Sequence, residues 1–68
     1  MKVHAKGTLK LGAMVIPVDI HDINSTYGRT RYSVSAVGGR GRVNKEDVEV
    51  DLSTLTPLQQ EEYAEMVH

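Results

Sequence analysis

Residues 2–11 alternate between apolar and polar side chains along their whole length. The apolar set is Val3, Ala5, Leu9 and Leu11 with Gly7 between them, and the polar set is Lys2, His4, Lys6, Thr8 and Lys10. A period of two with one apolar face is typical of a half-buried antiparallel strand. Gly7 in the middle of this strand predicts a bend or a bulge.

The second apolar stretch, residues 14–23, has apolar side chains on both faces. One face would hold Met14, Ile16, Val18 and Ile20, and the other Val15, Pro17, Asp19, His21 and Ile23. This pattern predicts a strand that is covered twice, by its own core and by a neighbour or another subunit. Pro17 lacks a backbone donor, which places it at an edge or a bulge.

Two shorter strands follow a turn at residues 24–28. In residues 29–37 the pattern predicts Tyr32, Val34 and Ala36 inward and Arg29, Arg31, Ser33 and Ser35 outward. Residues 38–41 are rich in glycine and should reverse the chain. A return strand then begins at Arg42, breaks at residues 44–47, and ends with Val48, Val50 and Leu52 on its inner face.

The C-terminal residues 56–68 predict a helix. Thr56 suits the N-cap, Pro57 the first helical position, and Gln59 completes a capping box. The expected buried stripe comprises Leu58, Tyr63, Met66 and Val67. Residues 1–68 are therefore expected to form one mainly β (α+β) domain, either a small SH3-like barrel or a strongly bent antiparallel sheet with one C-terminal helix.

Composition limits how such a domain can be stabilised. The 68 residues contain no Phe, no Trp and no Cys, so the core is mostly aliphatic and neither a disulfide nor a thiolate zinc site can form. Since small cores are often supplemented by self-association, we expect a homo-oligomer. No apolar run is long enough to span a membrane, and the expected location is the cytoplasm.

Charge is distributed unevenly along the chain. Residues 1–45 hold all eight Lys and Arg, and residues 46–68 hold seven of the nine carboxylates. The simplest interpretation is that the acidic last strand and helix lie beside basic strands in the same molecule. The lysines of residues 2–10 form either a solvated strand face or, less commonly, part of a nucleic-acid surface.

The usual catalytic and metal patterns are missing. The serines lie in no nucleophile motif, and no phosphate-binding or dinucleotide fingerprint is present, so we expect a protein that is not an enzyme and has no cofactor. Asp19 and His21 share a strand face, but two ligands are too few for a closed metal site.

Anion binding is the chemistry that the sequence favours. Gly38, Gly39 and Gly41 would let backbone amides approach a phosphate. Arg40 and Arg42 should project to one side of a strand, and guanidinium groups suit bidentate phosphate contacts. The expected ligand-binding residues are Tyr27, Arg29, Arg31, Tyr32, Gly39, Arg40, Gly41 and Arg42, with a tyrosine as a stacking surface. The alternative is a glycine-rich hairpin with solvated arginines.

One loose pattern suggests an origin. Tyr27-Gly28-Arg29-Thr30-Arg31-Tyr32-x-Val34, followed by Val37-Gly38-Gly39-x-Gly41, resembles a group of short uncharacterised proteins encoded by bacteriophages. The resemblance covers residues 14–43. In that group an aromatic residue, often Trp, follows the glycine turn, whereas residues 42–45 here are Arg-Val-Asn-Lys. The resemblance implies a phage accessory protein in the host cytoplasm, one that could counter host defence.

Two classes of function remain open. The first is a binding module for a phosphate-bearing ligand, either a nucleotide or a nucleic acid. The second is a protein-interaction module that uses its acidic helix and polarised surface to bind and inhibit a host protein.

Overall fold

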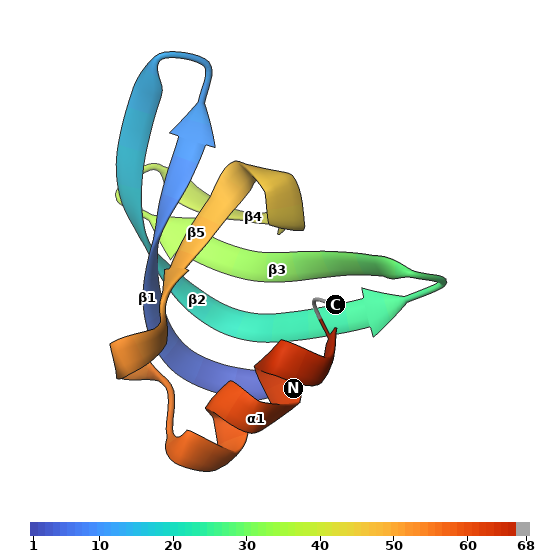
Figure 1. The fold of residues 1–68 in the computed structure, drawn as a ribbon. Coiled ribbons are helices and arrows are strands. Elements are labelled where there is room, and N and C mark those ends of the chain that lie inside the picture. Colours follow the sequence, from blue (N-terminus) through green and yellow to red (C-terminus); the bar gives the residue numbers. More distant parts are fainter. Residues whose placement is uncertain (67–68) are drawn as a thin grey trace.

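A computed structural model describes residues 1–66, which form five strands and one helix (Figure 1). The elements are β1 (Lys2–Leu11), β2 (Met14–Thr26), β3 (Arg29–Ala36), β4 (Gly39–Asn44), β5 (Val48–Asp51) and α1 (Pro57–Met66), with 3-10 turns at Lys45–Asp47 and Leu52–Thr54. All strand pairs are antiparallel, in the order β4-β3-β2-β1-β5. No helix within residues 1–66 is long and apolar enough to cross a membrane.

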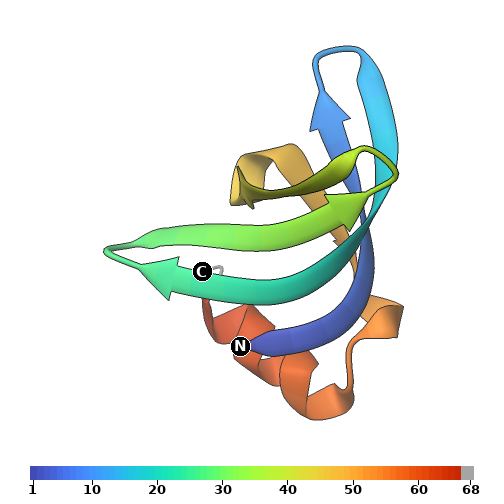
Figure 2. The same cartoon turned by 180° about the vertical axis from the view of Figure 1, so that it is seen from behind.

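The sheet is strongly bent and stays open, so the second of the two predicted architectures is confirmed. The long strand β2 joins its two parts, because its residues 14–22 pair with β1 and its residues 19–26 pair with β3. Residues 10–16, which we call the arm, pair only with one another or with Leu9 and project beyond the other strands (Figures 1 and 2). The helix α1 lies at the other end of the molecule (Figure 1).

A β-bulge in β2 corrects the predicted two-faced strand. Ile20 pairs with Val34, and Asp22 pairs with the neighbouring Ser33. β2 therefore contains one extra residue between these two pairs. Ile20 and Ile23 consequently both lie in the core, although strict alternation placed Ile23 on the outer face. Pro17 precedes the β2–β3 pairing, which begins at Asp19, and this agrees with the predicted edge position.

Gly7 is explained by close packing. A Cβ atom at this position would lie 2.8 Å from the carbonyl oxygen of Glu49 and 2.8 Å from Cδ1 of Ile20. Only glycine therefore fits between the neighbouring strands β2 and β5. The sequence predicted a bend or a bulge at Gly7, and the irregularity in the β1 register falls instead between Lys2 and Ala5.

Tyr32 occupies the centre of the core. Its side chain is 0% exposed, and its hydroxyl lies 2.8 Å from the hydroxyl of Tyr63 on α1, where either group can donate. Burial, followed by this hydrogen bond and the charge of Glu46, raises the pKa of the Tyr32 phenol well above its ordinary value. The buried apolar residues around it are Val3, Ala5, Val18, Ile20, Ile23, Val34, Val48 and Leu55.

The helix begins as the sequence predicts. The Thr56 amide donates to the side chain of Gln59, and the Gln59 amide donates to the Thr56 hydroxyl, which completes the capping box. Tyr63 and Met66 pack against the core. Leu58 does not share their face and is 77% exposed, so its predicted burial was wrong. Leu52, also predicted inward, lies exposed in a 3-10 turn, and Val67 falls outside the described residues.

We expect Tyr32→Phe to lower the free energy of unfolding by about 0.5–1.5 kcal/mol, because it removes one buried hydrogen bond. The wild-type protein should also lose stability above pH 10.0, the ordinary pKa of the phenol, since the unfolded phenol releases its proton before the buried one. Above this pH, the Tyr32 phenol should lower the free energy of unfolding by about 1.4 kcal/mol for each pH unit, and the variant should not show this loss. Urea unfolding of both proteins across this pH range is the measurement, and identical alkaline losses would contradict the account.

Candidate anion-binding site

The outer face of β3 and β4 is determined by what the two strands bury. Tyr32 and Val34 point into the core, so the alternating residues Arg29, Arg31, Ser33 and Ser35 face outward. On β4 the inward residue is Val43, and Arg40, Arg42 and Asn44 face outward. Each pair of arginines lies on one side of its strand, as predicted, and the register between β3 and β4 brings the two pairs to the same face.

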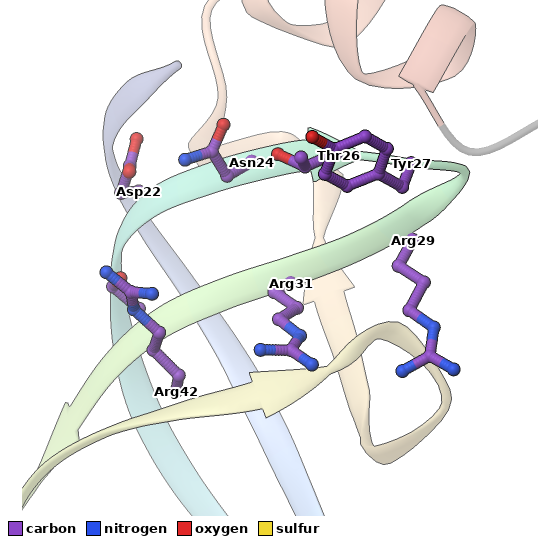
Figure 3. A pocket seen from close by; sticks show the side chains of 8 residues that line it. Asp22, Asn24, Thr26, Tyr27, Arg29, Arg31 and Arg42 are labelled. Carbon is purple, nitrogen blue, oxygen red and sulfur yellow. The ribbon is translucent and has the colours of Figure 1, made fainter.

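A shallow pocket of about 510 Å³ lies on this face (Figure 3). Its lining comes from β2, the β2–β3 turn, β3 and β4, and consists of Asp22, Asn24, Thr26, Tyr27, Arg29, Arg31, Ser33 and Arg42. Arg29 and Arg31 extend from β3 in nearly the same direction, and Arg42 reaches back from β4 toward β3 (Figure 3). Three guanidinium groups thus lie around one polar depression.

These arginines differ in their pairing from Lys6 and Lys10 of β1. Lys6 is bonded to Asp19, and its ammonium holds the pKa of that carboxyl below its ordinary value. Lys10 lies 3.3 Å from Glu49 on β5. Within residues 1–66 the outward arginines of β3 and β4 make no ion pair. The predicted pairing of basic and acidic segments is therefore confirmed for β1 and β5, and it leaves the arginine charges uncompensated.

The carboxylates near the pocket are already engaged. Asp22 lines the pocket, but its Oδ1 lies 3.3 Å from the N-terminal ammonium. Asp19, the next outward carboxylate along β2, is held by Lys6. Because each of these negative charges has its own cation, the potential over the pocket is set mainly by the arginines.

Tyr27 lies at the tip of the β2–β3 hairpin with its side chain fully exposed (100%). Its φ is 53°, and that of Gly28 is 76°, so both residues of the two-residue loop are left-handed, as a type I′ turn requires. Asn-Gly is the preferred sequence for such a turn. A tyrosine in this conformation is strained by about 1–2 kcal/mol, and its ring contributes nothing to the core.

The structure separates the predicted site residues into groups. Arg29, Arg31, Arg42 and Tyr27 meet at the pocket, whereas Arg40 lies on the same face beyond it. Gly39 has a φ of 135° and serves the β3–β4 turn, and Gly41 alternates with the arginines. Neither glycine lines the pocket. Tyr32 is enclosed in the core, so its ring offers no stacking surface.

Asn24, Thr26 and Ser33 line the pocket without having been predicted to bind. The outward position of Ser33 was apparent from its alternation with Tyr32. The outward positions of Asn24 and Thr26 depend on the bulge before Asp22, because the bulge decides which residues in the second half of β2 face outward.

The side chains considered as metal ligands have other partners. The Nε2 atom of His21 lies 2.6 Å from the Ser35 hydroxyl, and Asp19 is bonded to Lys6. Among residues 1–66 no group of three or more His, Asp or Glu side chains is arranged to hold a metal ion.

Comparison of the chain with protein families, curated proteins and solved structures gives no match. The interpretation of this pocket therefore rests on its own geometry and charge.

We expect Tyr27→Asn to raise the free energy of unfolding by roughly 0.5–1 kcal/mol, since asparagine tolerates the left-handed conformation better than tyrosine. Tyr27→Ala is the matched control, because alanine removes the ring but keeps a Cβ atom and cannot make the local hydrogen bonds of asparagine. Thermal unfolding of the three proteins measures the difference. If the Tyr27→Asn variant is not more stable than the wild type and the Tyr27→Ala variant, this turn is not strained.

Proposed function

We propose that the outer face of β2, β3 and β4 binds a phosphate-bearing ligand and that the protein acts through binding, without catalysing a reaction. The observation that carries this proposal is the group formed by Arg29, Arg31 and Arg42, whose exposed guanidinium groups surround one pocket and have no ion pair within residues 1–66. Three like charges in one place repel each other, and an anion relieves that repulsion.

The chemistry of the lining supports a phosphate group. Guanidinium groups donate to two phosphate oxygens at once and are more weakly hydrated than ammonium groups, so they lose less on binding. Asn24 and Ser33 add neutral hydrogen-bonding groups beside the arginines. The pocket volume of about 510 Å³ lies within the range of roughly 300–1,000 Å³ found for small-molecule sites.

The biological setting of the proposal comes from the sequence resemblance. A phage accessory protein acting in the host cytoplasm would meet nucleotides and nucleic acids, and sequestering either could counter a host defence. The resemblance bears only on which phosphate-bearing ligand the protein meets, and the chemistry of the lining residues does not depend on it.

We expect the double substitution Arg31→Ala with Arg42→Ala to leave thermal stability almost unchanged, because exposed charges contribute little to folding. Binding of the phosphate ligand should weaken by about 1.5–3 kcal/mol for each charge-assisted hydrogen bond that the substitutions remove. Calorimetry with single-stranded DNA, RNA and linear and cyclic nucleotides at low and physiological salt measures the affinity. The substitution Lys10→Glu changes the net charge by the same two units on the arm, away from the pocket, and the variant should bind as the wild type does. If the wild-type protein binds nothing on this panel, the proposal is wrong.

The arm favours a second candidate function, a protein-interaction module. Leu11, Met14 and Val15 are all exposed on it, with Val15 at 66%, although a small soluble domain has few apolar side chains to leave outside its core. A partner protein or a second copy of the chain could cover them. The small core, which the sequence also indicates, makes a second copy the first occupant to test.

We expect the wild-type protein to be an oligomer at micromolar concentration and Met14→Glu to shift it toward the mass of one chain, since the substitution introduces a charge into the apolar contact. Leu58→Glu is the control, because Leu58 is also an exposed apolar residue but lies on α1 at the other end of the molecule. Light scattering measures the mass. A wild-type mass of one chain would refute self-association and would leave a host protein as the partner to seek by pull-down.

A further inference from the structure

The register of the sheet distributes the arginines evenly along the outer face. Across β3 and β4, Asn44 lies opposite Arg31, Arg42 opposite Ser33, and Arg40 opposite Ser35. Arg29 lies two residues before Arg31 on β3. Four successive outward rows of the sheet therefore contain one arginine each, in the order Arg29, Arg31, Arg42 and Arg40. We call these four residues the arginine track.

Each row also places a neutral polar side chain beside its arginine. Thr26 pairs with Arg29 across β2 and β3, and Asn24 pairs with Arg31. Ser33 and Ser35 pair with the two arginines of β4. On β2 these two rows end with Asp22 and Asp19, whose charges are held by the N-terminal ammonium and by Lys6. A repeated unit of one guanidinium with one hydroxyl or amide fits a ligand that presents the same anionic group at regular intervals.

The spacing of the rows fits a nucleic-acid backbone. Outward residues two apart on a strand are separated by about 6.5–7 Å, so the four rows extend over about 20 Å. The backbone of one nucleotide contains about six bonds, and that of one amino-acid residue contains about three. An extended nucleotide therefore spans about the same distance as two strand residues, which is the distance between rows. One nucleotide of an extended strand therefore advances by about one row.

We propose that the ligand of this face is a single-stranded nucleic acid whose consecutive phosphates contact the arginine track. This inference rests on the proposed function and specifies its ligand class. A free nucleotide holds its phosphates close together and can meet the arginines at the pocket, but it cannot also reach Arg40, which lies beyond the pocket lining. An extended phosphodiester chain meets all four charges.

The exposed ring of Tyr27 favours a single strand over a duplex as the ligand. Its fully exposed ring follows Thr26, at the end of the track that begins with Arg29. An aromatic ring stacks on a base only when that base is free of its own stacked neighbours, as in a single strand. The stacking and the phosphate contacts are both tolerant of sequence, so the protein binds without strong base preference.

The test uses oligothymidylate and oligouridylate of increasing length, from one nucleotide to about eight, with the full-length protein. Affinity should rise with each added phosphate until about four are bound, and should then level off. For four phosphate contacts the slope of log K against log salt concentration should be about −2.8, because a single strand contributes about −0.7 for each contact. The two series differ in the sugar and in the C5 methyl group of the base, so oligodeoxyuridylate is the third series that shows whether the sugar contributes.

Single substitutions test the track residue by residue. Arg40→Ala is the most informative variant, since Arg40 lies outside the pocket, and it should reduce the slope by about 0.7. Arg40→Lys keeps the charge and should restore the slope. Tyr27→Ala should weaken binding by about tenfold or more and leave the slope unchanged. Lys10→Ala removes a charge from the arm and should change neither quantity.

The outcomes separate this inference from the proposed function. If mononucleotides bind as tightly as the longest oligomer and Arg40→Ala has no effect, the single-strand inference is wrong and the phosphate-binding function stands. If neither nucleotides nor oligomers bind, both are wrong. An affinity that grows with length, together with a slope that falls on removal of Arg40, supports both.

Discussion

The burial of Tyr32 is the constraint on which the arrangement of this protein depends. Its ring fills the core, and its hydroxyl meets that of Tyr63, so β3 and α1 are fixed to one another. A shift of β3 by one residue would expose Tyr32 and bury Arg31 and Ser33, at a cost that the small core could not offset. The same contact that holds the core therefore also holds the outer face of β3 in place.

The bulge in β2 extends this outer face to a third strand. With one extra residue before Asp22, β2 buries Ile23 and turns Asn24 and Thr26 toward the arginines. Without the bulge, alternation would place Ile23 outside and the two polar residues inside. Packing and the polar surface thus depend on the same local irregularity. Lys6 and Lys10 of β1 contribute little to this surface, because they are paired with carboxylates.

The sequence predicted the features that depend on near neighbours. Alternation gave the outward arginines of β3, and the spacing of Thr56 and Gln59 gave the capping box. Features that depend on distant strands were missed. Gly7 is required by atoms of Glu49 and Ile20, and the bulge in β2 reflects its pairing with β3.

The candidate site shows the same division. The alternation that placed the arginines outward also placed Tyr32 inward, and its burial in the structure removes it from the candidate stacking residues. Tyr27 lies in the two-residue turn between β2 and β3, where alternation does not assign a face, and its full exposure is seen only in the structure. The even spacing of the arginines along the sheet required the register between β3 and β4, which the pattern of residues 38–42 did not fix.

The most direct test of the central claim is a titration of the ¹⁵N-labelled protein with a short single-stranded oligonucleotide, followed by NMR through the amide shifts of each residue. The account predicts that the shifts are confined to the β2–β3 turn and the outer face, at Tyr27, Arg29, Arg31, Ser33, Ser35, Arg40 and Arg42. Shifts centred on the arm or on α1, or no shifts at a concentration that saturates a phosphate site, would contradict it.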